Sequence, residues 1–201
     1  MPNRRLPIVV LSLLAACGDS TTSPGTSQGR FDFSDPAGDT VATTASVDTF
    51  PALDAIEVSG STDRDTLTLT IRFAHPVQSG DQAPNSVVAR LEVDADADTA
   101  TGIPPTTPFE GSARLGVDFY VFIPDTSGTG ADVQDIATQQ STAYPASYGG
   151  SDVTIRIPLA ALGAPEDSLR FVGLVGTSQR ATDLLPNAGS YTIGVASALP
   201  R

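Results

Sequence analysis

The sequence predicts an all-β protein, an antiparallel β-sandwich with a single short helical turn. Apolar and polar residues alternate along several short segments, which is the period of a strand with one buried face. The 18 Gly and 16 Pro residues cluster between these segments, where they favour turns. Nearly all of the 23 acidic residues are Asp, which favours turns and caps over helix interiors.

The first 16 residues have the three parts of a secretory signal peptide. Arg4 and Arg5 supply the positive charge, an apolar run covers residues 6–14, and two small Ala residues follow. A bilayer-spanning helix needs about 20 apolar residues, so this run is too short for a membrane anchor. We expect the segment to direct export.

Leu14, Ala15 and Ala16 precede Cys17, the one Cys in the chain. These four residues resemble a lipobox, the processing site of bacterial lipoproteins. The resemblance implies that Cys17 carries fatty acyl chains such as palmitate and anchors the protein in the cell-envelope membrane. Because Gly18 rather than Asp follows the Cys, it implies the outer membrane if the organism is Gram-negative.

The mature chain divides into a tether and one domain. Residues 17–30 are rich in Ser, Thr and Gly and lack apolar periodicity, which predicts a flexible linker after the lipidated Cys. The alternating segments begin beyond it, so we expect the β-sandwich to cover residues 31–198. This length is ordinary for one domain.

About eight strands are expected in this domain. The clearest is residues 64–74, where Leu67, Leu69 and Ile71 alternate with Thr and Arg. The other candidates, in order, are 54–60, 86–95, 115–124, 131–140, 151–158, 169–177 and 190–196. Turns are expected at 79–85, 101–111, 125–130, 147–152 and 186–190, and one short helical turn is expected after Pro158.

The order of several motifs is similar to that in bacterial β-sandwich domains of the kind found in family 9 carbohydrate-binding modules and DOMON-like domains. The motifs are DPAGDT (35–40), LDAIEV (53–58), EVDADADTATG (92–102), VTIRIPLAALG (153–163) and DLLPNAG (183–189). This resemblance implies a jelly-roll-like sandwich that is exported and binds a sugar, calcium or haem.

The aromatic residues are the candidates for a sugar-binding surface. Sugar-binding members stack a pyranose on exposed aromatics, usually Trp, and this chain has no Trp. Phe109, Tyr144 and Tyr148 fall in expected loops and are the candidate ligand-binding residues, although aromatics more often pack on a core. Haem is less well supported, because an axial pair is wanted and His75 is the one His.

The acidic run VDADADTATG is the candidate metal site. Asp94, Asp96 and Asp98, with Asp118 from the neighbouring expected strand, offer the carboxylate oxygens that calcium prefers. Residues two apart in a flat strand are about 6.6 Å apart, so the three convergent ligands require the chain to curl. An EF-hand is excluded, because its Gly and Glu positions hold Thr99 and Pro105. The alternative is a hydrated acidic turn.

A second acidic set comprises Asp35, Asp39 and Asp54. Because Pro36 and Gly38 lie beside the first two, ordinary turn chemistry is the favoured interpretation. Asp183 is similar, and it either caps its turn or lies near a ligand face.

No pattern in the chain indicates catalysis, so we expect a protein that is not an enzyme. His75 has no partner motif of a nucleophilic triad, and neither a phosphate-binding loop nor a dinucleotide-binding fingerprint is present. The net charge of −12 argues against binding to nucleic acid or to an anionic bilayer surface.

The expected function is therefore that of a lipid-anchored binding module with a calcium-stabilised loop and a glycan ligand. The alternative is a structural or protein-interaction subunit of a cell-envelope complex.

Overall fold

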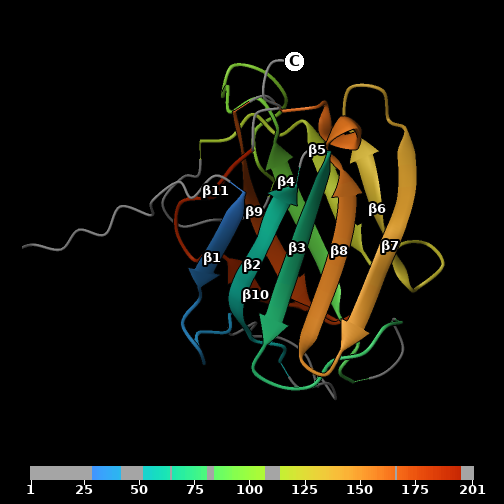
Figure 1. The fold of residues 1–201 in the computed structure, drawn as a ribbon. Helices are drawn as coiled ribbons and strands as arrows, with labels where there is room; N and C mark the ends of the chain where they lie inside the picture. Colours follow the sequence, from blue (N-terminus) through green and yellow to red (C-terminus); the bar gives the residue numbers. More distant parts are fainter. Residues whose placement is uncertain are drawn as a thin grey trace, which may run out of the picture.

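The computed structural model describes residues 29–41, 52–63, 65–80, 84–106, 114–165 and 167–195. It confirms the all-β prediction: the described residues form eleven antiparallel strands and one 3-10 turn, η1 (Leu159–Leu162). Two layers of strands pack face to face (Figure 1). The signal segment and Cys17 lie outside the described residues. Within those residues no helix is long and apolar enough to cross a membrane.

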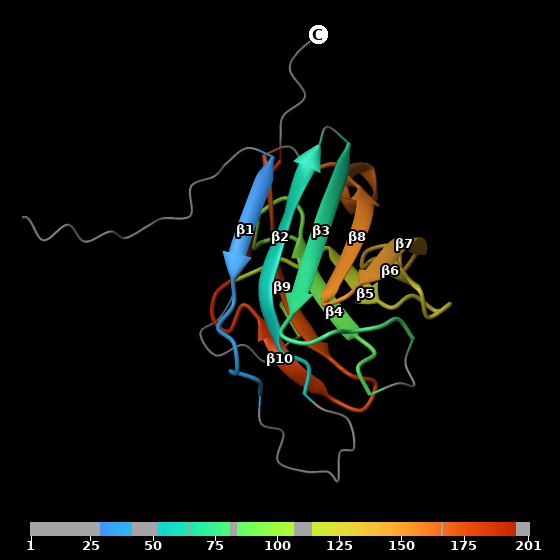
Figure 2. The same cartoon turned by 60° about the horizontal axis from the view of Figure 1, so that its bottom comes forward.

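The first layer runs β1–β2–β3–β8. Its strands are β1 (Arg30–Ser34), β2 (Ala55–Asp63), β3 (Thr66–Phe73) and β8 (Asp152–Pro158). Along β3 the residues Leu67, Leu69 and Ile71 are buried while the alternate Thr side chains are half-exposed, as the periodicity predicts. Figure 2 shows this layer with β1 at its edge.

The second layer is built around β9 (Ser168–Gly176). On one side of β9 lie β4 (Val88–Asp94), β5 (Phe119–Ile123) and β6 (Gly130–Asp135), in that order. The other side is shared by β11 (Tyr191–Gly194) and β10 (Ala181–Leu185), which pair with successive halves of β9.

One strand joins the two layers. The first part of β7 (Ser141–Gly149) pairs with β6 up to Pro145, and the second part pairs with β8 from Ala146 onward. The sequence predicted no strand here, which is wrong, and a turn at 147–152, which the structure confines to Gly150 and Ser151. No side chain of β7 is fully buried, so the strand is held by backbone pairing on its two neighbours and leaves no apolar alternation to detect.

The core fills the space between the layers. Its fully buried side chains include Phe73, Ile155 and Ile157 from the first layer and Ile123 and Phe171 from the second. On the side where β1 and β11 meet, aromatic rings close the sandwich. The ring of Phe33 stacks on that of Tyr191 at 4.6 Å between centroids, and Tyr191 contacts Phe171 at 5.3 Å.

Candidate functional site

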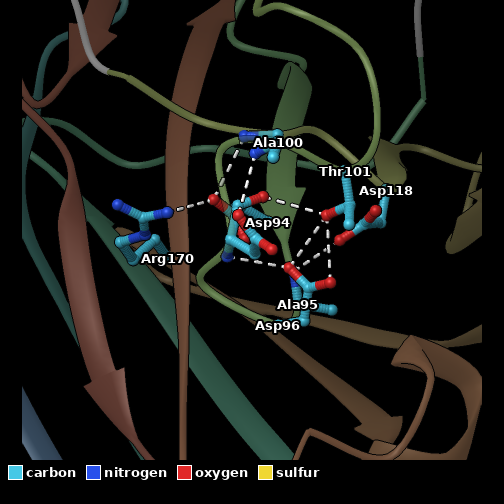
Figure 3. A network of polar contacts seen from close by, with 9 residues as sticks. Asp94, Ala95, Asp96, Ala100, Thr101, Asp118 and Arg170 are labelled. Atoms are coloured by element: carbon cyan, nitrogen blue, oxygen red, sulfur yellow. Dashed lines mark hydrogen bonds and ion pairs between the residues drawn. The ribbon is translucent and has the colours of Figure 1, made fainter.

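The acidic run curls directly after β4 ends, at Asp94 (Figure 3). Ala97 has a positive φ of 56°, which turns the chain back on itself. As a result, one carboxylate oxygen from each of Asp94, Asp96 and Asp118 lies within 4.8 Å of the others. Two oxygens on one calcium ion can be about 5 Å apart, so the spacing fits a shared ion. We call these three residues the Asp94 trio.

Two glycines allow the loop to approach the segment that carries Asp118. A Cβ on Gly116 would lie 2.1 Å from the carbonyl oxygen of Thr101, and one on Gly102 would lie 2.4 Å from that of Val117. Between them, the Ile103 and Val117 backbones exchange hydrogen bonds of 2.9 and 2.8 Å. The loop and the start of β5 are therefore in direct backbone contact, which brings Asp118 to the run.

Asp94 is the buried member of the trio, with no exposed surface. Its Oδ2 accepts a hydrogen bond from the Gly116 N–H at 3.1 Å and pairs with the Arg170 guanidinium at 2.5 Å. Arg170 lies directly opposite Asp94 in the register of β4 and β9. The other oxygen, Oδ1, is buried and has no hydrogen-bond partner in the described structure. Such an atom is costly to leave unpaired.

Asp96 is the exposed member. Its Oδ1 accepts a hydrogen bond from the Asp98 N–H at 2.9 Å, and both of its oxygens lie within 3.1 Å of the Thr101 hydroxyl. The Asp98 backbone bond is the main cause that lowers the pKa of the Asp96 carboxyl. Asp96 is therefore ionised at neutral pH and available to a cation.

Asp118 is half-buried, and burial raises the pKa of its carboxyl. The Ala95 N–H, which donates to Oδ2 at 3.0 Å, works in the opposite direction, while the charges of Asp96 and Asp94 raise the pKa further. A bound cation would remove this repulsion.

Three of the four predicted metal ligands thus come together, and the fourth does not join them. Asp98 turns away, and its Oδ1 accepts a hydrogen bond from the Ala100 N–H at 2.9 Å. This is the turn chemistry typical of Asp. Sequence reasoning did not identify Thr101 and Arg170 as contacts of the trio, because neither forms a motif with the aspartates.

A cavity of about 950 Å³ opens beside the trio. Asp96 and Asp118 line one wall, and Asp135 and Asp167 add two more carboxylates. Apolar surface comes from Phe119 and from several small residues and aliphatic side chains, namely Ile103, Val117, Ile136 and Pro165. The cavity is therefore acidic with apolar patches.

Two of the aromatic candidates do not lie in loops, and for them that expectation is wrong: Tyr144 and Tyr148 both belong to β7. Each packs against the core and is half-buried. Tyr144 also lines a smaller hollow of about 260 Å³, which shares Phe119, Asp135 and Gly163 with the main cavity. Phe109 lies outside the described residues. Tyr144 is thus the aromatic candidate that lies next to the acidic cavity.

The chain matches no family model, and no curated protein or solved structure is significantly similar to it.

Proposed function

We propose that this chain is an exported, lipid-anchored and non-catalytic binding module, with calcium held by the Asp94 trio and a glycan bound in the adjoining cavity. The convergence of three carboxylates at the wall of a 950 Å³ cavity supports this most directly. The tether from Cys17 would hold the domain off the membrane surface while it binds its ligand.

The donor set favours calcium among the common metal ions. The trio offers oxygen ligands alone, which hard cations prefer, whereas zinc sites use His and Cys. The Arg170 guanidinium pairs with one oxygen of Asp94 and leaves Oδ1 to the ion. Calcium accepts irregular coordination, which suits ligands from a curled loop and a strand start.

The cavity favours a neutral, hydroxyl-rich ligand. Carboxylates accept hydrogen bonds from sugar hydroxyls, and the calcium could coordinate a pair of them. The apolar patches formed by Phe119 and Ile103 suit the apolar face of a sugar ring. An anionic ligand would be repelled by Asp135 and Asp167. The resemblance to family 9 carbohydrate-binding modules supports the same ligand class.

A docking subunit of an envelope complex would need a broad apolar surface. Among the described residues, Val41 is the one large hydrophobic residue that is exposed, at 39%. That observation favours the small-ligand module over the docking subunit.

The test is a glycan array probed with the full chain in detergent, in calcium and in chelator. We expect calcium-dependent binding that Asp96→Asn abolishes. Asp65→Asn, which removes an exposed charge on the turn before β3, is the matched control and keeps the binding. An array without a bound glycan in calcium, together with a protein partner recovered by crosslinking in intact envelopes, would favour the docking alternative.

A further inference from the structure

A second group of carboxylates gathers on the side of the molecule where β1 ends. One oxygen from each of Asp35, Asp39 and Asp183 lies within 4.8 Å of the others. Asp54 lies close enough for its charge to act on both Asp35 and Asp183. The sequence favoured turn chemistry for Asp35, Asp39 and Asp54, and it left Asp183 as either a turn cap or a residue near a ligand face. The Gly38 N–H donates to Asp54 Oδ2 at 2.9 Å, which joins the segment after β1 to the segment before β2.

Three oxygens of this group are buried and have no hydrogen-bond partner in the described structure. They are Oδ2 of Asp35, Oδ1 of Asp39 and Oδ1 of Asp54. The Asp35 residue is 6% exposed and Asp183 is fully buried, so water screens them poorly. Buried oxygens are normally paired, and a bound cation would supply a partner for these three.

The partners that these carboxylates do have are neutral donors. The Tyr191 hydroxyl donates to Asp35 at 3.3 Å, and the Asn187 amide donates to Asp39. The Ala55 and Leu184 N–H groups each donate to Asp183 at 2.8 Å. These bonds orient the oxygens without neutralising their charge.

The ionised forms of Asp35 and Asp183 are disfavoured at these positions. Burial, together with the charges of Asp183 and Asp39, raises the pKa of Asp35 to about 7. Burial is also the main cause that raises the pKa of Asp183 to about 6. A divalent cation among the four carboxylates would neutralise them and satisfy the unpaired oxygens together.

We propose that Asp35, Asp39, Asp54 and Asp183 form a second cation site, separate from the Asp94 trio, that binds calcium. Asp35, Asp39 and Asp183 offer carboxylate oxygens alone, and Asp54, which binds the Gly38 N–H next to Asp39, adds a fourth carboxylate beside them. A set of oxygen ligands of this kind matches a hard cation. The four residues come from segments in both layers, so an ion bound to them would link the layers. Asp35 and Asp39 follow β1, Asp54 precedes β2, and Asp183 belongs to β10 in the other layer.

A cation at this point clamps the edge strand β1 and the segment after it onto the second layer. Two existing contacts lie along the same seam: the Val41 N–H donates to the Thr182 carbonyl at 2.7 Å, and the Thr182 hydroxyl donates to the Leu53 carbonyl at 2.6 Å. The chain enters β1 at Arg30, whereas the clamp lies just after Ser34, so the cation would fix the far end of this edge strand.

The experiment is calcium titration by calorimetry on the metal-stripped full chain in detergent, with variants that separate the two sites. We expect two bound calcium ions in the wild type and one in Asp96→Asn. Adding Asp39→Asn or Asp54→Asn to Asp96→Asn should remove the remaining ion. Asp32→Asn on β1 is the matched control, because it removes an exposed charge three residues before Asp35 and should leave binding unchanged.

Two results would overturn the second site. One is calcium binding in Asp96→Asn that neither Asp39→Asn nor Asp54→Asn alters, and the other is no calcium binding left in Asp96→Asn. A different result would count against the Asp94 trio. If Asp39→Asn loses one calcium ion while Asp96→Asn binds as many ions as the wild type, the second site stands and the trio is not a calcium centre. Having two second-site variants covers the case in which one of them fails to fold.

Hydrogen exchange supplies a readout of the clamp itself. Calcium should slow exchange of the Val41 and Gly38 amides in Asp96→Asn, where the first centre is removed. Unchanged exchange at both amides, with calcium bound, would show that the ion does not hold this seam.

Discussion

At the scale of single residues, the Asp94–Arg170 pair has the most consequence. A fully buried carboxylate lies against a guanidinium that is 21% exposed, and the two residues face each other across β4 and β9. Removing one partner of such a pair is far more costly than removing both, because a buried charge is left without compensation.

We therefore expect Arg170→Met to lower the free energy of unfolding by about 3 kcal/mol in chelator. If the trio holds calcium, added calcium restores part of the loss, because the ion replaces the missing positive charge. Urea unfolding with and without calcium measures both effects. Arg156→Met, at an exposed position on β8, is the control and should change little. Equal losses in the two variants would contradict the role given to the pair.

Gly116 is the second residue for which the structure makes a specific prediction. A Cβ there would lie 2.1 Å from the Thr101 carbonyl oxygen and 2.5 Å from that of Asp98, so the loop must move away from the start of β5. Gly116→Ala should lower the melting temperature and weaken calcium binding at the trio at least tenfold. Gly149→Ala is the control, since nothing lies within 4 Å of its Cβ position. Calcium affinity in Gly116→Ala equal to that of the wild type would show that this approach does not shape the site.

At the scale of elements, the strands divide by how they are held. The sequence predicted β3, β4, β5, β8 and β9, since each buries alternate side chains or a continuous apolar run. It did not predict β1, β7 or β10. The first two bury no side chain fully, and β10 is short and contains Asp183. These three strands are held by backbone hydrogen bonds to neighbouring strands, and the pattern of apolar residues along one segment does not reveal such pairing.

The turn between β5 and β6 carries a prediction of its own. Asp125 Oδ1 accepts hydrogen bonds from the Ser127 hydroxyl and from the N–H groups of Ser127, Thr129 and Gly130. The Ser127 hydroxyl is the largest cause that lowers the pKa of Asp125 from 3.8 to about 2. Because the folded-state pKa is depressed, the stabilisation is present above pH 3.8 and is lost as the pH falls through 2.

We expect Asp125→Asn to melt at a lower temperature than the wild type at pH 7, with the difference shrinking toward pH 2. Thermal unfolding at a series of pH values checks this. Asp65→Asn, at an exposed turn position, is the control and should run parallel to the wild type. A difference that stays constant down to pH 2 would mean that the carboxylate charge contributes nothing to this turn.

At the scale of the whole molecule, the proposed lipid anchor predicts where the protein is found. Acyl chains stabilise membrane attachment by about 0.8 kcal/mol per buried methylene, so a multiply acylated Cys17 holds the domain at a membrane. In Cys17→Ser, labelling by a fatty-acid analogue should be lost and the protein should move to the soluble fraction after export. The control is Ser20→Ala, which alters the linker and leaves the acceptor thiol in place. Retained labelling in Cys17→Ser would defeat the lipoprotein proposal.

The proposed calcium binding also predicts an effect on the whole molecule, because an ion that binds only the native state stabilises it by mass action. Metal-stripped full chain should melt at a higher temperature in millimolar calcium, and the increase should be smaller in Asp96→Asn. A melting temperature that calcium does not change would indicate that the acidic run is a hydrated turn.

The sequence by itself determined the all-β class, the buried faces of the clearest strands and the places where acidic residues concentrate. These follow from local periodicity and from the turn chemistry of Asp, Gly and Pro, which act over a few neighbouring residues. It also indicated that Asp94, Asp96 and Asp98 could all reach one ion only if the chain curls.

The tertiary structure alone decided which carboxylates meet. Asp98 does not join the trio because its Oδ1 accepts a hydrogen bond from the Ala100 N–H. Arg170 reaches Asp94 through the register of two strands that are far apart in the chain. Asp183 meets Asp35 and Asp39 because β10 packs beside the segment that follows β1. Convergence of this kind depends on strand pairing between distant segments, and a carboxylate carries the same local signal whether it meets an ion, a backbone N–H or water.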